Sequence, residues 1–120
     1  MINWVVTFDE AFAAEFATFP RDAQTALLAR ARLLETFGPQ LGRPHVDTLK
    51  GSKHANMKEL RFDAADGAWR AAFAFDARRQ AVVLVAGDKS GASQTRFYRW
   101  LIGTADKRFD AHLAQRRTGD

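Results

Sequence analysis

The chain has 120 residues, the usual size of one compact domain, and we expect a single domain over residues 1–120. It contains no cysteine, which excludes disulfide frameworks and thiolate metal sites and favours a reducing cytoplasm. No apolar stretch is long enough to span a bilayer and the start lacks the pattern of a signal peptide, so we expect a soluble protein with no membrane partner.

The positive charge is unevenly distributed. The formal net charge is +4 and the pI about 10.0, but residues 1–42 carry a net −2 and the remainder +6. A basic segment of this kind favours a polyanionic partner, nucleic acid above all.

The first third of the chain predicts a strand and two helices. A short apolar strand covers Asn3 to Phe8, and Asp9 is suited to cap the helix that follows. A second helix starts at Pro20 and ends at Gly38-Pro39. Because both helices carry apolar residues at helical spacing, we expect them to form an antiparallel hairpin. These residues are Phe12, Phe16 and Phe19 in the first helix and Ala23, Leu27, Ala31 and Leu34 in the second.

The rest of the chain predicts a long loop over residues 39–56, three strands and a last helix. The element order β-α-α-β-β-β-α indicates an α+β protein with a small, mainly antiparallel sheet. The expected strands are residues 57–63, 68–76 and 80–87, with an Asp66-Gly67 hairpin turn, and the expected helix runs from Ser93 to about Arg117 with Tyr98, Ile102, Ala105, Phe109 and Leu113 on one face.

One face of this sheet carries charged residues. Side chains alternate along a strand, which places Glu59, Arg61 and Arg70 opposite the aromatic face. We expect the helices to cover the aromatic face and to leave the charged face open, with Ala72 and Ala74 leaving room for a substrate.

Further basic residues lie next to these strands. The preceding loop contains Lys50, Lys53 and His54, and Lys89 follows the last strand. Arginine and lysine suit phosphate oxygens, histidine can move protons near neutral pH, and a carboxylate such as Glu59 can act as a general base. The combination predicts a site for a phosphodiester.

Ordinary structural roles remain open for each of these residues. Glu59 and Arg61 could form a solvated ion pair, His54 could be a surface histidine, and the lysines could serve solubility. The aromatic residues Phe97, Tyr98 and Trp100 are expected to pack the helix. No metal or cofactor is expected, because the three histidines lack ligand spacing and there is no P-loop, dinucleotide fingerprint or nucleophile elbow.

Several short motifs occur together in a characteristic order: Leu49-Lys50-Gly51-Ser52, Glu59-Leu60-Arg61-Phe62, Trp69-Arg70, Gly87-Asp88-Lys89, and a helix with Ala105 and Arg108. In this order they resemble the RelE/ParE superfamily of bacterial toxins, and within it the HigB-like, phage-derived branch. The resemblance covers about Phe8 to Leu113 and implies a RelE-like fold, with a helical hairpin on one side of a small sheet and a C-terminal helix.

This resemblance implies the toxin of a type II toxin–antitoxin system, which inhibits translation by metal-independent, ribosome-dependent endonucleolytic cleavage of mRNA. In such enzymes the ribose 2′-hydroxyl attacks the adjacent phosphorus and leaves a 2′,3′-cyclic phosphate and a 5′-hydroxyl. The implied partners are mRNA, the ribosome and its rRNA, and a cognate antitoxin with a helix-turn-helix domain, which forms a hetero-oligomer with the toxin.

The resemblance also implies roles for individual residues. Arg70 matches the arginine that contacts the scissile phosphate, and Arg61 and Lys89 occupy basic positions. We expect these three to stabilise the transition state, and Glu59 or His54 to take the 2′-hydroxyl proton. Residues expected to hold RNA are Lys50, Lys53 and Lys58.

The chain also departs from the pattern, because Met57 and Glu59 stand where better-known members have a lysine pair, and no residue clearly matches the general acid. Two other functions remain open: a ParE-like DNA gyrase inhibitor that acts by binding, and an RNA-binding or regulatory domain whose nuclease activity has decayed.

Overall fold

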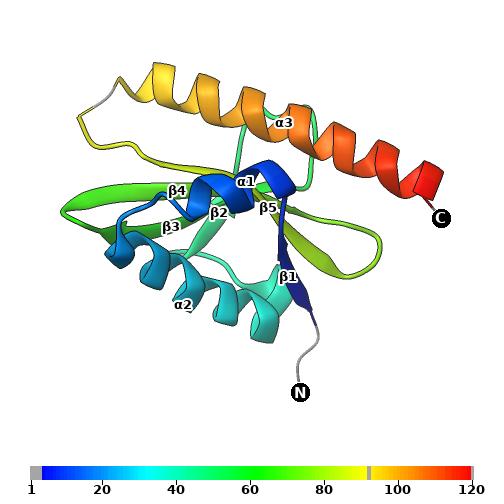
Figure 1. Ribbon diagram of the computed structural model, residues 1–120, viewed down its shortest axis with the longest axis horizontal. Coiled ribbons are helices and arrows are strands. Elements are labelled where there is room, and N and C mark those ends of the chain that lie inside the picture. Colours follow the sequence, from blue (N-terminus) through cyan, green and yellow to red (C-terminus); the bar gives the residue numbers. More distant parts are fainter. Residues whose placement is uncertain (1–3, 92, 120) are drawn as a thin grey trace.

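The computed structural model describes residues 4–91 and 93–119, which form one α+β domain with a five-stranded sheet (Figure 1). The strand order is β1-β5-β4-β3-β2, antiparallel except that β1 pairs in parallel with β5. In chain order the elements are β1 (Val5–Phe8), α1 (Glu10–Phe16), α2 (Arg21–Phe37), the short 3-10 helix η1 (Gly38–Gln40), β2 (Val46–Thr48), β3 (Met57–Ala64), β4 (Gly67–Phe75), β5 (Gln80–Asp88) and α3 (Gln94–Gly119).

The α+β class and the element order are confirmed, with one strand more than expected. β2 lies within the segment that was expected to be a loop, and it adds an edge to the sheet by pairing with β3. Its three residues are too few to show an alternating pattern, so the sequence carried no signal for it. The expected start of the first strand, Asn3, lies outside the described residues.

The helix boundaries follow the expected capping signals. The Phe12 backbone N–H donates a 3.1 Å hydrogen bond to Asp9 Oδ2, which fixes the start of α1. Pro20 precedes the first turn of α2, and Gly38 ends it with a φ of +57°. The β3–β4 hairpin turns at Ala65-Asp66, both with positive φ, one residue earlier than the expected Asp-Gly centre.

The sheet lies between two helical layers, with α1 and α2 on one face and α3 on the other (Figure 1). Each layer buries an apolar cluster. The first includes Phe12, Leu27, Leu34, Trp69 and Phe73. The second includes Met57, Ala72, Ala74, Leu101 and Phe109.

The second cluster corrects the expectation of an open charged face. Ala72 and Ala74 are fully buried beneath α3, so their small side chains make room for a helix rather than for a substrate. The apolar stripe of α3 explains this arrangement, because an amphipathic helix must bury that stripe and the aromatic face was already covered by α1 and α2.

The length of α3 raises the question of a membrane span, since 26 residues could cross a bilayer. Among the described residues, however, no helix is both long and apolar enough to do so.

Candidate active site

Glu59 lies at the centre of a polar cluster beneath the start of α3. It is a buried charged residue, with 4% of its surface exposed. Its Oε2 accepts hydrogen bonds from Arg61 Nη2 at 3.0 Å and Nε at 3.3 Å, and its Oε1 accepts one from the Tyr98 hydroxyl at 2.7 Å. Arg70 Nε lies 3.8 Å from Oε1. One carboxylate therefore joins two strands and a helix.

Strand register explains why these groups meet. Arg61 lies directly opposite Arg70 in the β3–β4 ladder, and Asp47 lies opposite Glu59 in the β2–β3 ladder. Two like charges in directly opposed positions repel each other. The Glu59 carboxylate compensates for this repulsion, and Asp47 Oδ2 adds a contact of 3.4 Å to Arg61 Nη2.

The electrostatics of the cluster keep its donors protonated. Hydrogen bonding to Glu59 raises the pKa of Arg61 despite partial burial. Burial, together with the hydrogen bond to Glu59, raises the pKa of the Tyr98 hydroxyl, while the Arg70 guanidinium lowers it to a smaller extent. Tyr98 therefore keeps its proton at neutral pH and donates it in the hydrogen bond to Glu59.

Arg70 has hydrogen-bonding capacity that the protein does not use. Its Nη1 donates to the Trp69 carbonyl at 2.8 Å, while its buried Nε has no hydrogen-bond partner in the described part of the chain. The Arg70 side chain is 15% exposed and that of Arg61 30%, so both side chains are partly accessible to solvent. Such a pair can contact a bound anion.

Lys89 lies close to this pair. Its backbone N–H donates to the Ala68 carbonyl at 2.8 Å and extends the β4–β5 ladder one step past β5. Gly87 pairs with Arg70, and side-chain alternation puts Lys89 on the same side of the sheet. The structure thus brings Glu59, Arg61, Arg70 and Lys89 to one region.

His54 and Lys53 lie elsewhere. His54 Nε2 is 2.8 Å from Asp110 Oδ1, and Lys53 Nζ forms an ion pair with the same carboxylate. This pairing raises the pKa of Lys53 and lowers that of Asp110. Ser52 and the Lys53 backbone N–H donate to Asp106, one turn earlier in α3.

The structure does not bring His54 to Glu59. Asp110 lies twelve residues after Tyr98 in α3, which at 1.5 Å per residue is about 18 Å along the helix. In this arrangement Lys53 and His54 fasten the β2–β3 loop to α3, and the His54 ring packs edge-on against Phe109 at 4.9 Å.

The two remaining expected RNA-binding lysines are also separated from the cluster. Lys50 is exposed in the β2–β3 loop. Lys58 precedes Glu59 in β3 and pairs with Phe73, so its side chain points to the opposite face of the sheet.

Two residues of the cluster were missed in the sequence. Tyr98 belongs to the apolar stripe of α3, a pattern that predicts packing, and only the position of Glu59 beneath it reveals its polar role. Asp47 lies in the short strand β2, which had no recognisable pattern. No group of three or more His, Asp or Glu side chains suited to a metal occurs within the residues that the structure describes.

Comparisons with known proteins agree on one family. Residues 14–110 match the family of phage-derived Gp49-like proteins. Two Mycobacterium tuberculosis (strain ATCC 25618 / H37Rv) proteins, HigB2 and HigB3, both named as toxins, are each 43% identical to the chain. The match to HigB2 covers 95% of this chain but 56% of HigB2, so the chain spans little more than half of that relative. The match to HigB3 covers 87% of this chain and 89% of HigB3.

Solved structures share the fold at low sequence identity. A mutant of the E. coli toxin RelE in its free state superimposes with a TM-score of 0.60 at 14% identity, over 90% of this chain and 98% of that chain. RelE in the archaeal RelE–RelB complex from Pyrococcus horikoshii gives a TM-score of 0.54 at 16% identity, over 76% and 100%. With the family match and the two close relatives, the chain belongs to the phage-derived Gp49-like family and is HigB-like, and it shares its fold with the toxin RelE.

Proposed function

We propose that the protein is the toxin of a type II toxin–antitoxin pair and that it inhibits translation in the cytoplasm by cutting mRNA that is bound to the ribosome. The observation that carries this proposal is the pair Arg61 and Arg70, held side by side on adjacent strands by Glu59. Two preorganised guanidiniums next to Lys89 suit the developing negative charge on a phosphodiester.

The chemistry needs no group beyond these side chains. The 2′-oxygen attacks phosphorus and its proton passes to the Glu59 carboxylate, while Arg61 and Arg70 stabilise the charge on the nonbridging oxygens. The P–O5′ bond breaks, and the Tyr98 hydroxyl gives its proton to the leaving oxygen. The proton that Glu59 has taken up then passes to Tyr98 along the 2.7 Å hydrogen bond between the two side chains. The products are a 2′,3′-cyclic phosphate and a 5′-hydroxyl.

The burial of Glu59 limits how this reaction can start. With 4% of its surface exposed and both oxygens occupied, Glu59 can meet a 2′-hydroxyl only when Arg61 or the first turn of α3 moves aside. His54 as the proton acceptor stays a prediction that the separation from Arg70 does not favour. Lys50 and Lys58 likewise stay predicted RNA contacts.

A protein partner is part of the same proposal. The RelE neighbour from Pyrococcus horikoshii was solved in complex with RelB, and the two M. tuberculosis relatives are named as toxins. These names support a cognate antitoxin for this chain. A helix-turn-helix domain in that antitoxin and a toxin–antitoxin hetero-oligomer remain expectations from the resemblance.

The test is induced expression in bacteria of wild type, Arg70→Ala and Tyr98→Phe, with growth followed and transcript 5′ ends mapped. We expect growth arrest and new 5′-hydroxyl mRNA ends for wild type. Removal of one donor to the developing charge should lower the cleavage rate of purified Arg70→Ala by about 10²–10³-fold. Arg32→Ala, an exposed arginine on α2, is the matched control and should behave as wild type.

The other outcomes separate the remaining functions. A fully toxic, cleaving Arg70→Ala would exclude the proposed role of this residue. Arrest with intact mRNA and DNA damage would favour a gyrase inhibitor, and expression of wild type without arrest would point to a decayed nuclease.

A further inference from the structure

A groove between α1 and α3 is not used by the proposed chemistry. Its volume is about 590 Å³, and it is lined by residues of both helices. Small residues, Ala11 on α1 and Gly103 and Ala111 on α3, leave it open, and a Cβ added at Gly103 would meet nothing within 4 Å. A polar contact joins the two helices here, because Arg108, which lines the groove, donates two hydrogen bonds to the Glu15 carboxylate on α1, at 2.9 and 2.6 Å.

Cations that the protein leaves uncompensated line this groove. One carboxylate, Asp9, also lines the groove and lies 3.8 Å from Arg108, which is paired with Glu15 as well. Arg99 and Lys107, by contrast, form no ion pair within the part of the chain that the structure describes. They lie eight residues apart on α3, about 12 Å along the helix axis. The groove therefore presents two separate positive charges that a polyanion with regularly spaced charges can meet together.

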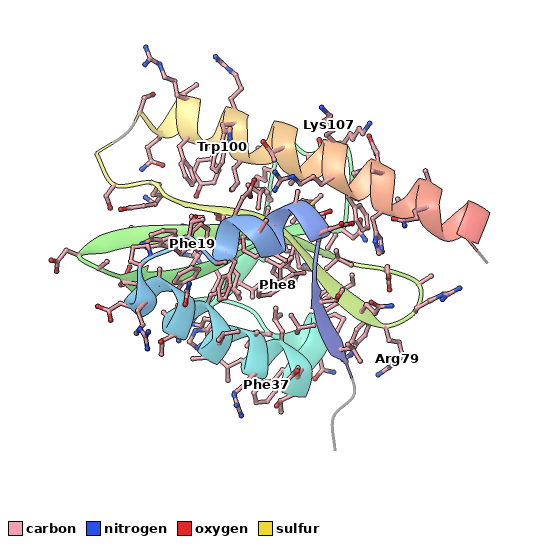
Figure 2. The ribbon with its side chains drawn as sticks, viewed as in Figure 1. Phe8, Phe19, Phe37, Arg79, Trp100 and Lys107 are labelled. Atoms are coloured by element: carbon pink, nitrogen blue, oxygen red, sulfur yellow. The ribbon has the colours of Figure 1, made fainter. Side chains whose placement is uncertain are left out.

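An exposed aromatic ring connects this groove to the candidate active site. Trp100 lines the groove and is 47% exposed, which is unusual for the largest apolar side chain. Its ring also packs on β5, where a Cβ added at Gly87 would lie 3.0 Å from it. Gly87 pairs with Arg70. Figure 2 shows Trp100 and Lys107 on the stretch of α3 that passes α1.

We propose that this groove is a binding track for single-stranded RNA, in which a base stacks on Trp100 and phosphates contact Arg99 and Lys107. Free cations next to an exposed aromatic ring are the features of surfaces that bind single strands without reading sequence. The inference rests on the proposed function, because it takes Arg61 and Arg70 as the point where RNA is cut and the groove as the path of the chain beyond that point. An acidic protein helix is the competing occupant.

The test uses a 12-nucleotide 2′-O-methyl RNA, which has no attacking hydroxyl and so reports binding without cleavage. We expect the double variant Arg99→Gln/Lys107→Gln to bind it at least tenfold more weakly at low salt. Loss of two phosphate contacts should also reduce the slope of log K against log salt by about 1.4. The control Arg21→Gln/Arg32→Gln removes the same charge from exposed positions on α2 and should bind as wild type.

Trp100→Ala tests stacking, with an expected loss of about 5- to 150-fold in affinity and partial recovery in Trp100→Phe. Circular dichroism verifies that each variant is folded. If Trp100→Ala unfolds, the double variant Arg99→Gln/Lys107→Gln, whose side chains are exposed, still tests whether the groove binds RNA. Equal RNA binding by the double variant and its control overturns the inference. It is also overturned if the double variant binds RNA as wild type does but no longer binds the antitoxin, because the groove would then be a protein-binding surface.

Cleavage distinguishes this inference from the proposed function. An mRNA that ends directly after the cleavage site cannot reach the groove, so on ribosomes the double variant should cleave it as wild type does while cutting longer mRNA more slowly. Wild type that binds the 12-nucleotide probe but cleaves no mRNA, either free or on ribosomes, overturns the proposed function and leaves the groove as an RNA-binding surface. Wild type that does not bind the probe overturns the groove inference.

Discussion

Glu59 has two roles, because it holds the site together and is the proposed acceptor of the 2′-hydroxyl proton. Its carboxylate lies between two guanidiniums that face each other across β3 and β4, and it fixes Tyr98 from α3. Removal of a buried charge usually costs more than the loss of its contacts, because the partners left behind are no longer compensated.

Substitution Glu59→Gln should therefore weaken the fold as well as the activity. It keeps the shape but leaves Arg61 and Arg70 without their common counterion, and we expect the free energy of unfolding at neutral pH to fall by about 3 kcal/mol in denaturant titration. Asp47→Asn is the control, because the contact of Asp47 with Arg61 is longer and more exposed and should be worth less than about 1 kcal/mol. A Glu59→Gln protein as stable as wild type would contradict this account.

The sequence identified the charged members of the site but not their surroundings. Alternation along β3 and β4 correctly placed Glu59, Arg61 and Arg70 on one face. It could not show that α3 covers this face, since which helix packs on which face depends on connections distant in the chain. The position of His54 in the loop before β3 predicts that it lies near Arg70, whereas the loop turns toward Asp110.

At the level of elements, α1 and α3 are joined by a polar contact. Arg108 reaches from α3 to Glu15 on α1 and also donates to the Leu84 carbonyl of β5 at 2.8 Å. These contacts join both helical layers to one strand.

The short strand β2, by contrast, could not be predicted from the sequence, because three residues are too few to show an alternating pattern.

The pH dependence of stability should report this contact. Hydrogen bonding to Arg108 holds the pKa of Glu15 below its usual value of 4.5. The pair therefore stabilises the fold above that value, and the stabilisation is lost as pH falls through the lower pKa of the folded state. The Glu15 side chain is 44% exposed, so solvent screening limits the contribution to about 1 kcal/mol or less.

Glu15→Gln should lower the melting temperature by a few degrees at neutral pH, and this difference should disappear at a pH below both values. Glu35→Gln on α2, which removes a carboxylate without a described ion pair, is the control. A constant difference at every pH would show that the effect of Glu15 is not the ion pair.

At the scale of the whole molecule, the sheet is the middle of three layers and neither face is exposed. The cluster under α3 is as necessary as the one under α1 and α2, because it buries residues from three strands. Loss of α3 would expose a large continuous apolar surface.

A chain that ends at Gly91 should therefore fail to remain a folded monomer, since Met57, Leu84 and Val85 would face water. Size-exclusion chromatography and near-UV circular dichroism should show aggregation or loss of tertiary structure. A chain that ends at Gln115 keeps every residue of the cluster and should elute and melt as the full chain does. A compact, cooperative protein without α3 would refute the three-layer account.

The parallel pairing of β1 with β5 joins the beginning of the chain to a late segment, with Val5 opposite Gln80. Contacts so distant in sequence form late, and the N-terminal part of a chain emerges from the ribosome first. The residues of α3 are synthesised after those of the whole sheet. A nascent chain therefore carries both arginines before it carries the helix that supplies Tyr98, and the centre is complete only when α3 has packed onto the sheet.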